Sequence, residues 1–111
     1  MAALTLIEVP VDGGAALEDS AVAATVSGDT APTGSGRFLY VKNGSGVSVT
    51  VTLATPGTVS GLDVENPTLV IAAGESGIIP LTRVFAAANG RASITYSAVT
   101  TVTVAAFELG N

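Results

Sequence analysis

The chain has 111 residues, of which 48% are hydrophobic, 5% aromatic and only 12% charged, and its formal net charge is −5. It contains no His, no Cys and no Trp. Because imidazole and thiolate groups are absent, zinc sites of the usual kind and Ser-His-Asp or Cys-His catalysis are excluded. We therefore expect a protein that is not an enzyme and that has no cofactor.

The charge balance opposes nucleic-acid binding, because phosphate backbones are bound by clustered Lys and Arg. The chain has four Lys and Arg against nine Asp and Glu. The four cations, Arg37, Lys42, Arg83 and Arg91, are also scattered along the sequence. We expect no nucleic-acid partner.

The N-terminal segment carries a short run of apolar residues, Leu4, Leu6, Ile7 and Val9, and Pro10 ends it. This pattern favours a strand. The segment lacks the basic region and the long apolar core of a signal peptide. No apolar run approaches the ~18 residues that are needed to span a bilayer. We expect a protein made in the cytoplasm with no membrane partner.

The rest of the first 35 residues reads differently from the remainder of the chain. Residues 15–26 are rich in alanine and predict a weak helix or an arm that lies on the body. Residues 27–36 (SGDTAPTGSG) have the composition of a flexible loop. We predict an N-terminal strand or arm with a flexible loop over 1–35 and a compact β-sandwich body over 36–111, together forming one domain.

Beyond residue 36, period-2 alternation predicts half-buried strands. The clearest are 46–53, with Val47, Val49, Val51 and Leu53 on one face, and 91–98, with Ala92, Ile94, Tyr96 and Ala98 facing inward. A third strand at 101–109 slips in phase at Ala105 and Ala106, where we predict a β-bulge.

Three segments are apolar on both faces, namely 38–41, 69–71 and 78–81. Strands that are covered on both sides have this composition. A second subunit is one candidate for such a cover. Pro80 cannot donate a ladder hydrogen bond, so the third segment is predicted at a sheet edge or a bulge.

Turn signals separate these strands. Asn43-Gly44 and Asn89-Gly90 are typical of turns in which two successive residues have positive φ. Asn43-Gly44-Ser45 also matches a glycosylation sequon, but we interpret it as a hairpin turn. Residues 83–88 form the one plausible helical turn. Short strands at this spacing predict an all-β fold, either a single β-sandwich (jelly-roll or immunoglobulin-like) or a small barrel with an N-terminal arm.

Few residues are candidates for a site. The acidic pairs Asp63 with Glu65 and Glu18 with Asp19 are of the type that binds Ca²⁺ or hydrolyses glycosides, but we interpret them as solvated surface charge. The apolar residues of the N-terminal segment either pack on the body or dock on a neighbouring chain by strand addition. The candidate partner interface therefore comprises Leu4, Leu6, Ile7, Val9 and Phe85.

Several strand and turn strings resemble a family of small tailed-phage proteins. They are RFLYVKNGSG at 37–46, VTVT at 49–52, TPGTV at 55–59, NGRASITYS at 89–97 and VTV at 102–104. The resemblance covers about residues 36–109 and extends loosely to Gly28-Asp29-Thr30. Genes of this family tend to lie among the head structural genes, and its members are taken to be virion structural proteins.

The resemblance implies a head decoration, or cement, protein on the capsid surface of the virion. Its expected partners are the major capsid protein and neighbouring copies of itself, with a homotrimer as one possible assembly. An acidic accessory protein is expected to stay off packaged DNA. The alternative hypothesis is a β-sandwich binding module on a phage tail or fibre that recognises host carbohydrate. The resemblance carries over no catalytic residue.

Overall fold

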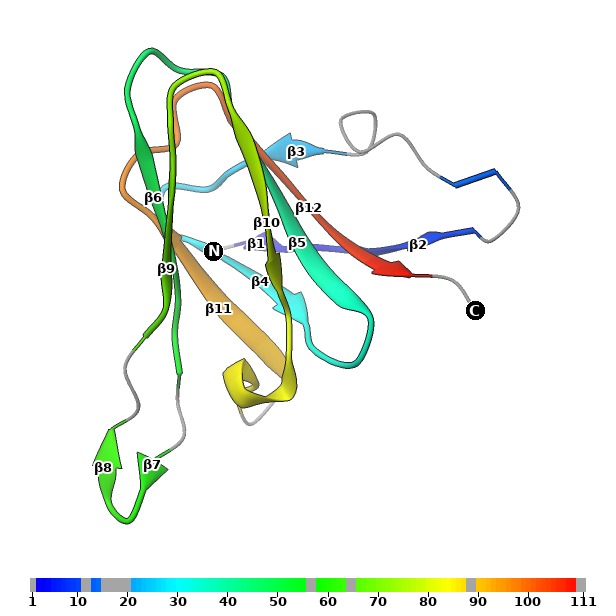
Figure 1. The fold of residues 1–111 in the computed structure, drawn as a ribbon, viewed down its shortest axis with the longest axis vertical. Coiled ribbons are helices and arrows are strands. Elements are labelled where there is room, and N and C mark those ends of the chain that lie inside the picture. The colour runs from blue at the N-terminus through cyan, green and yellow to red at the C-terminus, as the bar shows by residue number, and fades with distance from the viewer. Residues whose placement is uncertain are drawn as a thin grey trace.

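The alternating strands pack as two β-sheets, which confirms the prediction of an all-β sandwich (Figure 1). The structure is a computed structural model and describes residues 2–10, 13–14, 21–55, 58–63, 66–87 and 90–109. The first sheet has the order β1 (Ala2–Ala3), β4 (Asp29–Pro32), β11 (Arg91–Tyr96), β6 (Val49–Leu53) and β9 (Thr68–Ile71). The pair β1 and β4 is parallel, and the other pairs of this sheet are antiparallel.

The second sheet has the order β10 (Ser76–Pro80), β5 (Arg37–Asn43), β12 (Val102–Leu109) and β2 (Leu6–Val9). The short strand β3 (Val22–Ala23) also pairs with β12. The pair β2 and β12 is parallel, whereas β5 is antiparallel to both β10 and β12. The N-terminal segment therefore adds one parallel strand to each sheet.

The main core lies between the two sheets. Along the strands of both sheets, every second side chain points into it. Val49, Val51 and Leu53 are fully buried, as the alternation predicts. Ala92 and Ile94 are also fully buried, and Tyr96 packs against the same core. Val47 is 63% exposed, because β6 begins only at Val49.

A second apolar cluster covers the outer face of the second sheet. Phe107 stacks on Phe38 with ring centroids 5.5 Å apart and meets Tyr40 edge-on at 6.5 Å. Ile7 and Val9 of β2 pack against this cluster. Three of the five aromatic residues thus lie outside the main core.

The bulge predicted at Ala105 and Ala106 is wrong. The pairing of β12 with β5 runs without interruption from Val102 opposite Asn43 to Glu108 opposite Arg37. The alternation breaks because β12 is buried on both faces, with Ala106 in the main core and Ala105 in the outer cluster.

Burial on both faces is confirmed for β5, where Leu39, Tyr40 and Val41 are all buried. Cover of β9 and β10 by a second subunit stays a prediction, and within this chain Val70 is 62% and Ile78 is 58% exposed. The reason is topological, because each of these strands lies at the edge of its sheet. The edge position predicted from Pro80 is confirmed.

The flexible loop predicted at 27–36 is wrong for residues 29–32, which form β4 and pair with β11. Tertiary contacts override the composition, since Asp29 and Ala31 are fully buried there. Of the segment 15–26, predicted as a weak helix or an arm, residues 15–20 lie outside the described residues. Val22 and Ala23 form β3.

The turn predicted at Asn43-Gly44 is also different. Gly44 does not adopt positive φ, and Asn43 is the fully buried last residue of β5. Its side-chain amide donates to the carbonyls of Val47 at 2.7 Å and Ile71 at 2.9 Å. The sequon nitrogen is therefore enclosed and hydrogen-bonded, and Asn89 of the second predicted turn lies outside the described residues.

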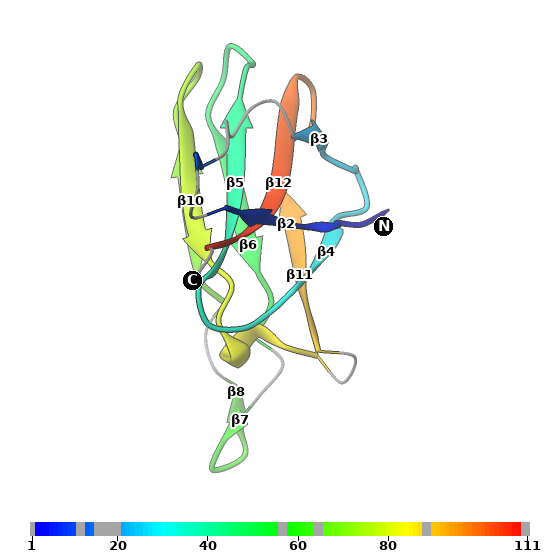
Figure 2. The same cartoon turned by 90° about the vertical axis from the view of Figure 1, so that its right-hand side faces the viewer.

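Two features stand away from the sheets (Figures 1 and 2). The hairpin of β7 (Thr58–Val59) and β8 (Leu62–Asp63) projects beyond the sandwich. Leu62, the first residue of β8, is 73% exposed. The 3₁₀ helix η2 (Arg83–Phe85) confirms the helical turn in a shorter form. No helix in the described part of the chain has the length and apolar character needed to cross a membrane.

Gly28 allows β4 to approach β11, and its replacement tests this packing. Gly28 has φ +99°, and a Cβ there would lie 2.5 Å from the Ile94 carbonyl oxygen. We expect Gly28→Ala to lower the free energy of unfolding by about 2–4 kcal/mol, measured by denaturant titration. Gly46→Ala is the matched control, because its Cβ would meet nothing within 4 Å and its φ is not positive. Equal stability of the two variants would contradict this packing.

Candidate partner interface

The N-terminal segment bridges the two sheets at one lateral end of the sandwich (Figure 2). Its first strand, β1, belongs to the first sheet, and β2 belongs to the second. Leu4 lies between them and is only 5% exposed. Its backbone N–H donates to the Thr30 carbonyl at 2.7 Å. The segment is therefore an integral part of the sandwich in this structure.

Arg91 fastens this bridge to β4. Its Nη2 donates to the carbonyl oxygens of Leu4 at 2.8 Å and Thr30 at 3.0 Å. Its Nε donates to the Thr30 hydroxyl at 3.0 Å. Hydrogen bonds from a charged donor are stronger than neutral ones. One guanidinium thus binds both the segment between β1 and β2 and the backbone of β4.

The side chains of β2 alternate between the two apolar clusters. Leu6 packs against the main core, whereas Ile7 and Val9 pack on the outer aromatic cluster. All three are half-buried, and Leu4 is buried inside its own chain. The sequence left open whether this segment packs on the body or pairs with a neighbouring chain. The structure shows it paired within its own sheets, and its contact with a partner stays a prediction.

Phe85, the fifth predicted interface residue, lies apart from the bridge. It belongs to η2, is half-buried and packs against the main core. The adjacent Ala86 forms an isolated bridge with Ala92 of β11. The predicted interface residues therefore do not form one continuous patch, since η2 and β2 lie in separate parts of the fold (Figure 1).

An apolar cavity of about 180 Å³ lies beneath the bridge. Its lining residues are small or aliphatic with the exception of one threonine, namely Ala3, Leu4, Thr5, Ile7, Val22, Val104, Ala105 and Ala106. None of these lining residues is charged.

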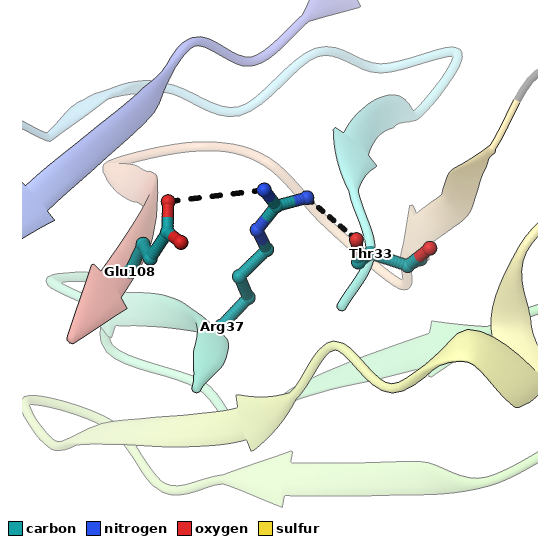
Figure 3. A network of polar contacts seen from close by, with 3 residues as sticks. All are labelled: Thr33, Arg37 and Glu108. Carbon is teal, nitrogen blue, oxygen red and sulfur yellow. Dashed lines mark hydrogen bonds and ion pairs between the residues drawn. The ribbon is translucent and has the colours of Figure 1, made fainter. Parts of the chain in front are cut away.

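Arg37 and Glu108 tie the start of β5 to the end of β12 (Figure 3). Their charged groups lie 3.8 Å apart, and both side chains are about a third exposed. Arg37 Nη1 also donates to the Thr33 carbonyl at 2.6 Å. An ion pair with this exposure contributes at most about 1 kcal/mol. Through its two contacts, Arg37 links the chain between β4 and β5 with the end of β12.

A buried carboxylate lies where β4 meets β11. Asp29 is fully buried, and one of its oxygens accepts hydrogen bonds from the Tyr96 hydroxyl at 2.7 Å and the Thr25 N–H at 3.2 Å. Its other oxygen has no protein partner among the described residues. Burial raises the pKa of Tyr96 above its ordinary value of 10.0, and the hydrogen bond and the charge of Asp29 add to this effect.

The acidic pairs found in the sequence give no site. Glu18, Asp19 and Glu65 lie outside the described residues, and Asp63 is described only by its backbone in β8. Within the described ranges, no three Asp, Glu, His or Cys side chains gather as metal ligands do.

Two exposed side chains that the sequence reading did not single out are Val70 and Ile78, at the free edges of β9 and β10. Their continuous apolar runs predicted these strands but did not show which side of each strand remains open. Pro80 was the one residue in the sequence that marked an edge. Comparison of the chain with protein-family models, with curated proteins and with solved structures found no match.

Removal of the Arg91 guanidinium is expected to loosen the N-terminal bridge. In Arg91→Gln, amide hydrogen exchange over residues 3–9 should accelerate about tenfold or more, because bonds from a charged donor to two backbone carbonyls are lost. The control Arg83→Gln alters an exposed arginine on η2 and should leave these rates unchanged. Unchanged exchange in Arg91→Gln would show that other contacts hold the bridge.

Tyr96 is expected to make the fold sensitive to alkali. Because its pKa is raised in the folded state, its contribution to stability is complete below pH 10 and is lost as the pH rises further. The free energy of unfolding should fall by about 1.4 kcal/mol per pH unit there. Denaturant titrations above pH 10 should show a shallower decline for Tyr96→Phe. An equal decline in both proteins would refute this assignment.

Proposed function

We propose that this chain is a structural protein of a tailed-phage virion, a head decoration protein that binds the outer surface of the capsid and stabilises it. The similarity of residues 36–109 to small phage head proteins supports this assignment. The physical observation that carries it is the pair of free sheet edges, β9 and β10, which contain no charged residue.

Isolated domains usually protect such edges with charged side chains, because an open edge pairs with other strands. Here the sequences of the two edges are TLVI and SGIIP, and each exposes a large apolar side chain near its centre, Val70 or Ile78. Pro80 protects only one end of β10. Edges of this kind suit a protein that is covered by neighbours when it works.

Both the number of copies and the charge of the chain fit this role. A capsid presents many equivalent sites, so weak single contacts add up to a large stabilisation of the shell. The net charge of −5 disfavours contact with packaged DNA and is compatible with the outer surface.

The carbohydrate-binding alternative gains no support from the side chains. Sugar sites stack the ring on an exposed aromatic face, whereas Phe107 is fully buried and Tyr40 is 4% exposed. Phe38, Phe85 and Tyr96 are half-buried against the two apolar clusters. No observation in the described residues favours this function over decoration.

Co-sedimentation with capsids tests the proposal. Purified protein is mixed with capsids of the source phage that lack it, and the capsids are pelleted. We expect binding to saturate at a fixed number of copies per capsid subunit, and decorated shells should withstand higher temperature.

Capsids that already carry the protein are the control, because their sites are filled and added protein should remain in the supernatant. Failure of the protein to pellet with bare capsids would overturn the decoration role.

A further inference from the structure

The outer edge of β10 presents a defined set of backbone groups. Glu75 and Leu81 flank the strand and hydrogen-bond to β5, through Asn43 N–H to the Glu75 carbonyl and Leu81 N–H to the Arg37 carbonyl, each at 2.9 Å. In an antiparallel pair, every second residue bonds to the same neighbour. Residues 77 and 79 therefore face β5, and Ser76, Ile78 and Pro80 direct their backbone groups outward.

This outward set is symmetric about Ile78. Ser76 and Ile78 each present an N–H and a carbonyl, and Pro80 presents only its carbonyl. The strand thus lacks a donor at one end and has a donor at the other, with Ile78 midway between them. Two antiparallel copies of β10 would place the donor end of each against the acceptor end of the other.

We propose that β10 is a self-association surface through which two copies of this chain pair antiparallel about a two-fold axis at Ile78. Ile78 N–H then donates to the Ile78 carbonyl of the second copy, and the symmetry axis repeats the bond. Ser76 N–H donates to the Pro80 carbonyl of the second copy, and this bond also occurs twice. Every outward N–H of β10 then has an acceptor, because Pro80 has no backbone N–H that would need one.

The side chains on this edge agree with the same register. Ile78 is 58% exposed and lies opposite Tyr40 on β5, beside the outer aromatic cluster. Across the proposed axis, the two Ile78 side chains lie on one face of the extended sheet, about 5.5 Å apart at Cα. The contact therefore extends an apolar surface that already exists on the second sheet.

The charges at the ends of the strand identify the occupant as a second copy. Glu75 precedes β10 and is exposed, whereas Arg83 follows it and is exposed. With Ile78 on the axis, the end of β10 that Glu75 precedes lies beside the end of the second copy's β10 that leads through Leu81 to Arg83 of η2. The assembly thus brings opposite charges together at both ends, which favours antiparallel self-pairing over other strands.

This contact adds to the proposed function by naming the surface between neighbouring copies, and it predicts two-fold pairing where the phage resemblance alone suggested a homotrimer. Its test in free solution involves no capsid. Loss of capsid binding and loss of self-association are therefore separate outcomes.

Sedimentation velocity of the full chain, from low micromolar to about 1 mM, measures the association. We expect the wild type to shift from monomer to dimer across this range. Ile78→Lys should remain a monomer, because it places two cations side by side at the axis. Val70→Lys is the matched control, a similarly exposed residue at the edge of β9, and should dimerise as the wild type does. A wild type that is monomeric throughout, or a loss in Val70→Lys equal to that in Ile78→Lys, would overturn the proposal.

A charge exchange tests the register itself. Glu75→Arg and Arg83→Glu, each alone, should raise the dimer dissociation constant several-fold, since like charges then meet. The double variant should restore the wild-type value. A double variant that binds as weakly as the single ones would overturn the two-fold register at Ile78.

Discussion

The pair β5 and β12 is apolar on both faces, and the rest of the fold follows from the need to cover both. Leu39 and Val41 of β5 and Val104 and Ala106 of β12 face the main core, where the first sheet covers them. Tyr40, Ala105 and Phe107 face the opposite side and form the outer cluster. There the cover includes the N-terminal segment, because Ile7 and Val9 pack on these rings. Side chains of an edge strand thus help to cover the outer face of the sheet to which that strand belongs.

The sequence predicted the architecture well where one rule sufficed. Alternation located β6 and β11, and Pro80 placed β10 at an edge. The sequence-based prediction of burial failed where burial depends on residues that are distant in the chain. The apolar runs of β5 and β9 look alike in sequence, yet the position within the sheet buries Tyr40 and leaves Val70 exposed. The same limitation explains the bulge at Ala105, since alternation alone does not reveal a second apolar cover.

Buried polar residues account for the other differences. Asp29 lies in a segment with the composition of a loop, and its hydrogen bond with Tyr96 joins two strands that are 67 residues apart in sequence. Asn43 has the sequence context of an exposed turn, but its amide bonds to the carbonyls of Val47 and Ile71 and holds the following loop. Residue type alone does not distinguish a solvated polar group from a buried one whose partners come from elsewhere in the chain. Three of the predicted interface residues, Leu6, Ile7 and Val9, do lie together in β2. The sequence could predict this because they are neighbours in the chain.

The parallel pairing of β2 with β12 has a consequence for how the protein is made. Leu6 pairs with Ala106, so one edge of the sandwich joins residues from opposite ends of the described chain. Contacts between residues so far apart in sequence form late, because a long loop must close first. During synthesis, β2 emerges from the ribosome long before the strand that it pairs with. The nascent chain therefore carries an unpaired apolar strand until residues 102–109 have been synthesised, an interval in which it is most prone to aggregation or chaperone binding.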